Sequence, residues 1–313
     1  MRSATALVCL AALCVLVAAE NTITYSDINV VPGVGVYPEG CVVEIPDGAR
    51  VFQHDRSFTV QFEDGTEIEY EEDLRCRPDT LPARIQAMLE AEGFPVQQSR
   101  VEHGWQAWTT YYYKDGIDSF PGYFTVPDIP EETTFNQILY IFTGLQNINW
   151  IPEPNGPAPW GKFDIIQPVL ELFGNEGWAL QSWYVPLPGM AKTSRKMNVN
   201  AGDNIFGNMT LTGPSTWTIV SQSTETGESV TLDVTNEDVL ASQPWAYTTL
   251  EVYNLDGCSQ YPDNDILFTD MDMYNQGNAL QVNWVAHTGQ ELVCGEQAIV
   301  NSPSNVTITF GTS

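Results

Sequence analysis

Short stretches in which apolar and polar residues alternate follow one another along most of this chain. Clusters of Pro, Gly, Asn and Asp separate them at the spacing typical of an antiparallel sandwich. We predict strands over residues 108–113, 122–126, 137–142, 163–172, 178–185, 204–212, 215–222, 229–234, 248–253, 280–285 and 306–310. For residues 102–313 we therefore expect a mainly β fold in which two antiparallel sheets pack face to face.

Residues 20–101 are acidic and contain shorter candidate elements. These are strands at 41–45 and 57–62, a hairpin at 62–68 and one helix at 79–93. The helix is expected because an apolar stripe at helical spacing lies between a capping residue, Asp79 or Thr80, and Gly93. We predict a small N-terminal α+β module, with a propeptide or a lid as the alternative. Within it, the acidic run 63–73 is expected to form a charged sheet edge.

Residues 1–19 have the pattern of a signal peptide. Arg2 precedes an apolar run over residues 4–16, and small residues follow before Glu20. The apolar run is shorter than the roughly 20 residues that a membrane-spanning helix requires. We therefore expect a secreted, extracellular protein that begins near Glu20 and is not inserted in a membrane.

Cleavage there would leave four cysteines in an oxidising compartment, and four cysteines allow three pairings. We expect Cys41 to pair with Cys76 and Cys258 with Cys294, because each pair brackets one local segment. The sequence alone leaves the other pairings open. Asn208 and Asn305 begin acceptor sequons and are candidate N-glycosylation sites of a secreted chain.

The charge of the chain narrows the choice of partner. It holds 12 Lys and Arg against 40 Asp and Glu, a net charge of −28, which repels nucleic acid and anionic membranes. Because the chain has so few basic groups, it gains little positive charge in acid and is repelled little by itself there. This property fits an acid hydrolase, and it fits equally a protein that works in acidic or salty surroundings.

The familiar signatures of cofactor and metal sites are missing from the sequence. We find no dinucleotide fingerprint, phosphate loop, nucleophile elbow or zinc-binding helix. His54, His103 and His287 stand far apart. The acidic run 263–272 could offer oxygen ligands to calcium, but it lacks the EF-hand glycine and glutamate, so we expect a solvated loop. No cofactor and no metal are expected.

A catalytic site without a metal, a cofactor or a histidine-activated nucleophile depends on carboxylates, amides and water. On the predicted strand 163–172, alternation places Gln167 and Glu171 on one face. On the strand 248–253, Glu251 and Tyr253 share a face, opposite the apolar Leu250. If both polar faces line one concave sheet, a carboxylate and a carboxamide meet there.

Several short motifs, in order, resemble those of the eqolisins, a family of glutamic peptidases with a concanavalin-like β-sandwich (jelly roll). The matching segments are Gly122-Tyr123-Phe124-Thr125-Val126-Pro127, Phe142-Thr143-Gly144-Leu145, Ile165-Ile166-Gln167, Ser182-Trp183-Tyr184, Ala201-Gly202-Asp203-Asn204-Ile205 and residues 246–251. The resemblance covers the region from about Trp105 to Cys258 and implies the family's fold for it.

The resemblance also implies roles for individual residues. Glu251 would act as the general base that activates a water, and Gln167 would hold that water and stabilise the oxyanion. Three neighbouring positions differ from the family pattern, because Phe142, Gln146 and Ser182 stand where the family has Trp, Asp and Glu. We expect these three, together with Glu171 and Tyr253, to support the site or bind substrate; a solvent-facing carboxylate is the alternative for Glu171.

The tryptophans suggest a different function on the same scaffold. Five of them lie in or beside the strands of the expected concave face: Trp150, Trp160, Trp178, Trp183 and Trp245. Indole rings stack on sugars as well as they fill cores, so Trp178 and Trp183 are candidates for glycan binding. The expected partner is therefore an extracellular polypeptide, or a polysaccharide if the chain is a non-catalytic, lectin-like protein. A purely structural extracellular protein is the third hypothesis.

Overall fold

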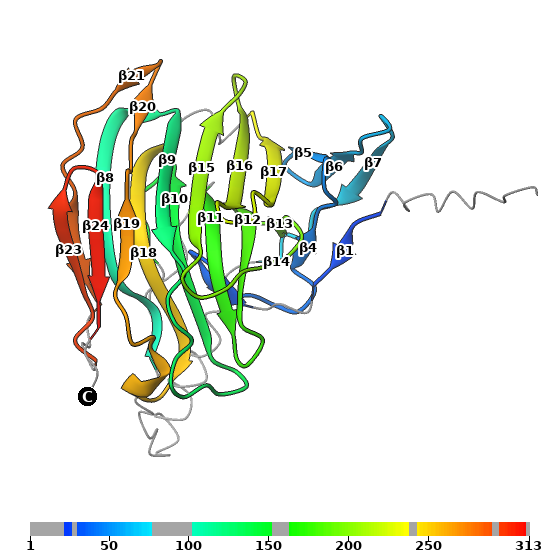
Figure 1. Cartoon of the computed structure of the whole chain (residues 1–313). Coiled ribbons are helices and arrows are strands. Elements are labelled where there is room, and N and C mark those ends of the chain that lie inside the picture. The colour runs from blue at the N-terminus through cyan, green and yellow to red at the C-terminus, as the bar shows by residue number, and fades with distance from the viewer. Residues whose placement is uncertain are drawn as a thin grey trace, which may run out of the picture.

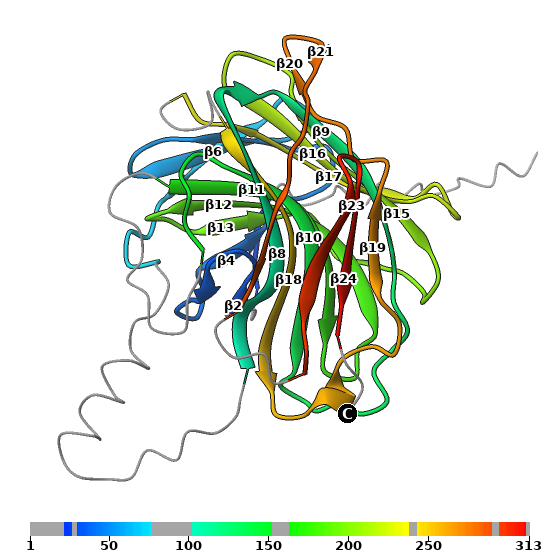
Figure 2. The ribbon, with the colours of Figure 1, turned by 90° about the vertical axis from the view of Figure 1, so that its left-hand side faces the viewer.

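Two large β-sheets stack to form a sandwich (Figures 1 and 2). The structure, a computed structural model, describes residues 22–26, 30–76, 102–151, 163–237, 243–289 and 294–310. The predicted signal segment, the predicted helix at 79–93 and Trp160 lie outside these residues. Within them, the 3-10 turn η1 (Cys258–Gln260) is the sole helical element, and no helix has the length and apolar character needed to cross a membrane. The mainly β prediction is confirmed.

The first sheet has ten strands and carries the candidate catalytic residues. In spatial order they are β1 (Thr24–Tyr25), β4 (Val42–Glu44), β13 (Ala191–Thr193), β12 (Trp178–Leu187), β11 (Phe163–Phe173), β10 (Ile138–Gln146), β18 (Gln243–Leu255), β8 (Glu102–Ile117) and β22 (Val285–Thr288), and β14 (Met197–Asn198) also pairs with β12. The central strands β10 and β12 are buried along their whole length. Both faces of this sheet are therefore covered at its centre.

The second sheet has twelve strands. In spatial order they are β23 (Gln297–Ser302), β24 (Asn305–Thr309), β19 (Ile266–Thr269), β9 (Ser119–Thr125), β15 (Asn204–Leu211), β16 (Thr216–Ser223), β17 (Ser229–Thr235), β5 (Arg50–Gln53), β6 (Ser57–Gln61) and β7 (Glu67–Glu71), and β20 (Tyr274–Asn275) pairs with β9 and with β21 (Asn278–Ala279). Strands β15 and β16 alternate between buried and half-buried residues. This sheet therefore packs on the first with one face and turns the other outward.

The two sheets approach closely between β11 and β15. A Cβ atom added to Gly207 would lie 2.8 Å from Cγ of Pro168, so glycine is required at this contact. Pro168 therefore points between the sheets, and by strand alternation its neighbour Gln167 points to the opposite, outer face.

Strands from the N-terminal region continue both sheets. β4 pairs in parallel with β13, and β5 pairs in parallel with β17. These are the sole parallel pairs among the described strands. The description of residues 20–101 as a separate module stays a prediction.

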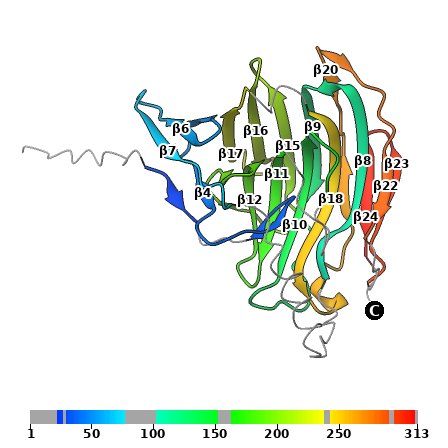
Figure 3. The same cartoon turned by 180° about the vertical axis from the view of Figure 1, so that it is seen from behind.

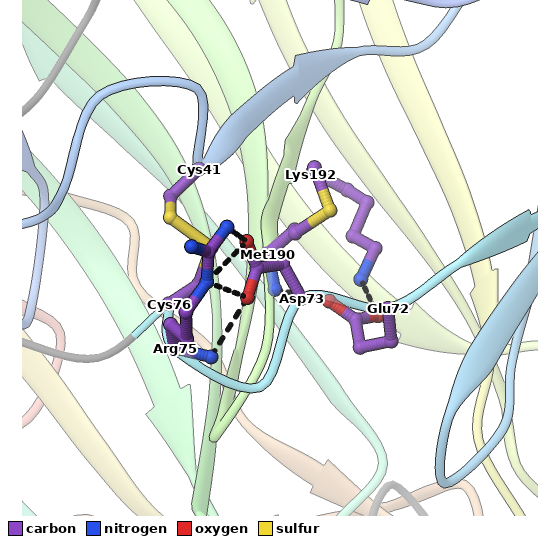
Figure 4. Close-up of a disulfide and its surroundings, with 7 residues drawn as sticks. All are labelled: Cys41, Glu72, Asp73, Arg75, Cys76, Met190 and Lys192. Carbon is purple, nitrogen blue, oxygen red and sulfur yellow. Dashed lines mark hydrogen bonds and ion pairs between the residues drawn. A yellow bond between two sulfur atoms is a disulfide. The ribbon is translucent and has the colours of Figure 1, made fainter.

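Both expected disulfides are present, between Cys41 and Cys76 and between Cys258 and Cys294. Close to the first, Glu72 accepts hydrogen bonds from the Met190 backbone and, at 2.7 Å, from Lys192 (Figure 4). The Glu72 and Lys192 side chains are 1% and 0% exposed. The ion pair attaches the end of the N-terminal region to β13, and the disulfide joins that end to the segment just before β4.

Two details differ from the sequence interpretation. Residues 280–284 are not a strand, and β22 begins at Val285 instead. Trp284 packs against Tyr111 and Phe120, and its indole donates to the Pro303 carbonyl. In the acidic run, Glu67, Glu69 and Glu71 lie exposed on β7, the edge of the larger sheet. Glu72, in contrast, is the buried partner of Lys192.

Candidate active site

Gln167 and Glu251 lie on the same face of the ten-stranded sheet. Gln167 belongs to β11 and Glu251 to β18, and β10 lies between these strands. Glu251 stands opposite Tyr140 of β10, which in turn stands opposite Glu171 of β11. Directly opposed residues share a face, and Glu171 shares the outer face with Gln167. The carboxylate and the carboxamide are therefore brought to one surface.

A small hairpin covers this surface. It consists of β2 (Val30–Val31) and β3 (Gly35–Val36), which form their own two-stranded sheet (Figures 2 and 3). The Val34 amide donates to the Val31 carbonyl at 3.2 Å, and Gly33 has a φ of +83°. Proline followed by a glycine of positive φ is the pattern of a type II turn.

The tip of the hairpin binds both candidate catalytic side chains. Nε2 of Gln167 donates to the Pro32 carbonyl at 2.6 Å, and the Gly33 amide donates to Oε2 of Glu251 at 2.6 Å. The two side chains thus bind the two polar ends of a single peptide unit. Both are 0% exposed.

The environment of Glu251 combines burial with hydrogen bonding. The Tyr253 hydroxyl donates to Oε1 at 2.5 Å, while the Gly33 amide occupies Oε2. Burial disfavours the charged form and raises the pKa of Glu251 to about 8, and the bonds from Tyr253 and Gly33 oppose this rise. The side chain is therefore protonated in acid while the hairpin covers it.

Trp105 was missed by the sequence interpretation. It stands opposite Glu251 across a register shift between β18 and β8, and its ring lies 5.8 Å from Phe142 and 5.1 Å from Tyr247. Its indole nitrogen is buried without a well-formed hydrogen bond, yet it is near enough to Glu251 to lower the pKa of that carboxyl. Trp105 is therefore a neighbouring donor to Glu251 and not a hydrogen-bond partner of it. Strand alternation could not locate it, because the register shift changes which residues face each other.

A comparison with models of known protein families gives one match. The sequence profile of the Peptidase A4 family matches residues 107–309, more than half of the chain. The chain belongs to the Peptidase A4 family. This is the eqolisin, or glutamic peptidase, family, so the resemblance of the sequence motifs is confirmed. A comparison with curated proteins gives no significant match.

Solved structures of eqolisins are similar to the chain at low identity. The scytalido-glutamic peptidase with a transition state analog inhibitor is 15% identical, with 67% of this chain and 99% of that one covered and a TM-score of 0.49. SCP-B, in complex with the tripeptide Ala-Ile-His, is 16% identical over the same shares, with a TM-score of 0.47. Aspergilloglutamic peptidase from Aspergillus niger is 15% identical, with 55% and 98% covered and a TM-score of 0.38.

Two further polar residues of the ten-stranded sheet, which we predicted as supporting groups, are buried. Glu171 is 1% exposed and pairs with Lys196 at 3.1 Å; burial raises its pKa to about 7, and Lys196 opposes the rise. Gln146 is 0% exposed, and neither polar atom of its carboxamide makes a hydrogen bond within the described part of the chain. Glu171 is thus a buried, paired carboxylate, and the solvent-facing alternative does not hold.

Ser182 and Trp178 lie on the opposite face of their strand from the site. Ser182 stands opposite Pro168 and contacts the hydroxyl of Ser221 at 3.0 Å, in the other sheet. Trp178 and Trp183 are 2% and 0% exposed. Their rings are therefore not available for stacking on a sugar, and the glycan-binding hypothesis finds no support at these two positions.

The remaining candidate sites lie at the surface. The acidic residues of the run 263–272 are exposed, and in the part of the chain that is described no three His, Cys, Asp or Glu could hold a metal ion. Asn208 and Asn305 are half-buried on β15 and β24, and their glycosylation stays a prediction.

A pocket of about 260 Å³ lies at Arg56, Phe163 and Pro188 and contains neither Gln167 nor Glu251.

Proposed function

We propose that this chain is a secreted glutamic peptidase that hydrolyses extracellular polypeptides at acidic pH. The observation that supports this most strongly is the binding of one peptide unit by two side chains, with its carbonyl at Gln167 and its amide at Glu251. A site that recognises both ends of a peptide group is suited to cleaving one. Membership of the Peptidase A4 family supports the same reaction, and the two disulfides fit an oxidising compartment.

The proposed reaction needs only a water and these two groups. The Glu251 carboxylate takes a proton from the water as its oxygen attacks the carbonyl carbon of the substrate. The Gln167 amide donates to the oxygen that becomes negative. Glu251 then gives the proton to the departing nitrogen, the C–N bond breaks, and a carboxylic acid and an amine result. Loss of such a base or donor typically costs a factor of about a hundred or more in rate.

The test is cleavage of a denatured protein at pH 3 to 6, followed by mass spectrometry. Because the pair is covered in the parent chain, a variant that displaces the hairpin, Gly33→Val, is assayed beside it. Adding Glu251→Gln or Gln167→Ala to that variant should abolish cleavage, whereas Glu69→Gln, a matched change on the exposed edge strand β7, should not. Absence of cleavage by both the parent and Gly33→Val, with circular dichroism showing a folded chain, would refute the proposal.

A further inference from the structure

The hairpin formed by residues 30–36 uses the hydrogen-bonding groups that a substrate would need. The Pro32 carbonyl occupies the Gln167 amide, and the Gly33 amide occupies Oε2 of Glu251. We propose that this hairpin is a built-in, uncleaved plug that keeps the candidate active site closed and that opens without leaving the molecule. The proposal rests on the peptidase function and adds its regulation.

The turn explains why the tip fits between the two side chains. In a four-residue turn the outer carbonyl and amide bond each other, here Val31 to Val34, and the polar groups of the central peptide are left free. That central peptide is Pro32–Gly33, so its carbonyl and amide can satisfy Gln167 and Glu251. The turn thus presents one peptide bond with no need for an extended chain.

The same geometry disfavours cleavage of that bond. A tight turn bends the chain away on both sides of its central peptide, so the hairpin tip does not cross the sheet as an extended segment. Oε2 of Glu251, which would have to activate a water, accepts the Gly33 amide at 2.6 Å instead. The raised pKa of the covered Glu251 also leaves the base protonated in acid.

The hairpin is held by more than its tip. Val31 and Val34 are 0% and 2% exposed and belong to the core cluster. The hydroxyl of Tyr140, on β10, donates to the Val30 carbonyl at 2.7 Å. The hairpin therefore packs on the sheet as part of the folded protein, not as a loop in contact at one point.

The chain on either side is attached to the same sheet. β1 precedes the hairpin and pairs with β4, which follows it and pairs with β13. Cys41 is disulfide-bonded to Cys76, next to the buried Glu72–Lys192 ion pair (Figure 4). A plug tethered in this way can lift from the pair and return, because its flanking strands stay in place.

Gly33 offers a selective way to displace the plug. A Cβ at this position would lie 2.8 Å from Cδ1 of Ile165 and 3.1 Å from Oε1 of Gln167, and its φ of +83° is one that a β-branched residue avoids. Gly65 is a matched control, because it has the same φ of +83° and nothing within 4 Å of an added Cβ. Gly33→Val should expel the tip, whereas Gly65→Val should impose similar backbone strain far from the site.

The experiment combines two readouts on the full mature chain at pH 4. Hydrogen exchange of a peptide covering residues 30–37 should be slow in the parent and in Gly65→Val and at least tenfold faster in Gly33→Val. Cleavage of a denatured protein should rise at least tenfold in Gly33→Val alone, and the intact mass of the parent should show the Pro32–Gly33 bond unbroken.

The outcomes separate the plug from the peptidase. If the parent cleaves the substrate and its hairpin already exchanges rapidly, the plug is overturned and the peptidase function stands. The same holds if Gly33→Val frees the hairpin but leaves the rate of cleavage unchanged. Scission at Pro32–Gly33 overturns the uncleaved plug and supports the peptidase. If Gly33→Val frees the hairpin and neither chain cleaves anything, the peptidase function fails and the inhibitory role fails with it.

Discussion

The hydroxyl of Tyr253 donates a hydrogen bond to Oε1 of Glu251 at 2.5 Å, from two residues further along the same face of β18. A donor in this position favours the charged carboxylate, whereas burial favours the neutral acid. The ionisation of Glu251 therefore depends on the balance between one phenol, the hairpin amide and the surrounding apolar groups.

Tyr253→Phe should raise the pKa of Glu251, because the variant loses a hydrogen bond to the charged form. In the Gly33→Val background, the acidic limb of the kcat/KM profile should move to higher pH by about one unit or more, as expected for a bond to a charged group of about 1.5–3 kcal/mol. Tyr247→Phe is the matched control, since that hydroxyl bonds Asn149 at 3.2 Å. A limb that stays in place in Tyr253→Phe would show that the bond does not tune Glu251.

The stability of the protein should be greatest in acid and decline toward neutral pH. Burial raises the pKa of Asp164 and of Glu171 to about 7 and that of Glu251 to about 8. An acid with a raised folded-state pKa binds its proton more tightly when folded, so its contribution is complete below the unfolded pKa, near 4, and is lost as pH rises through 7 to 8. Thermal unfolding followed from pH 4 to 9 should show a falling Tm.

A comparison of variants assigns this slope to its source. Glu251→Gln removes one of the three groups and should flatten the decline between pH 5 and 8, whereas Glu69→Gln on the exposed β7 should leave it unchanged. A Tm that rises from pH 4 to 8 in the parent would contradict the assignment of raised pKa values to these buried acids.

The alternation of apolar and polar residues predicted much of the sheet architecture and placed two candidate catalytic side chains on one face of a sheet. It succeeded for Gln167 and Glu251 because each lies within a long, regular strand, where side-chain direction follows from position. Alternation could not tell which of the two neighbours, Ser182 or Trp183, lies on the same face as Gln167, since that depends on the pairing of β12 with β11. A shift of one residue exchanges the two faces.

The hairpin escaped prediction for a different reason. Its strands are only two residues each, too short for alternation to be recognised, although Pro32 and Gly33 form a typical turn pair. Its place on the sheet depends on contacts between residues more than a hundred positions apart, such as Tyr140 with Val30. Local sequence carries no information about such a contact.

The ion pair between Glu72 and Lys192 should be sensitive to removal of one partner. Both side chains are almost fully buried, and Gln53 bonds each of them, at 2.8 and 2.6 Å. Lys192→Met leaves a buried carboxylate without its cation and should lower the free energy of unfolding by about 3–5 kcal/mol. Urea denaturation at pH 7 measures the loss.

A second change should recover part of that loss. Adding Glu72→Gln to Lys192→Met removes the unpaired charge, so the double variant should be more stable than Lys192→Met alone. Arg195→Ala breaks exposed pairs with Asp47 and Glu228 and should cost no more than about 1 kcal/mol per pair. Equal losses in the buried and the exposed variants would mean that burial of the Glu72–Lys192 pair has no energetic consequence.

The two disulfides offer a final comparison, because they close loops of almost equal length. Cys41 and Cys76 are 35 residues apart, and Cys258 and Cys294 are 36 apart. In the chain-entropy description each should stabilise the fold by a similar amount, about 3–4 kcal/mol, so replacing either pair with serines should lower Tm by similar amounts. The bond at Cys41 also restrains the segment that carries the hairpin, whereas the bond at Cys258 does not.

Only Cys41→Ser/Cys76→Ser should therefore speed hydrogen exchange of residues 30–37 and raise cleavage at pH 4, at a temperature well below both transitions. If the two double variants raise exchange and cleavage equally, general loosening of the fold, and not release of the hairpin, governs access to Glu251.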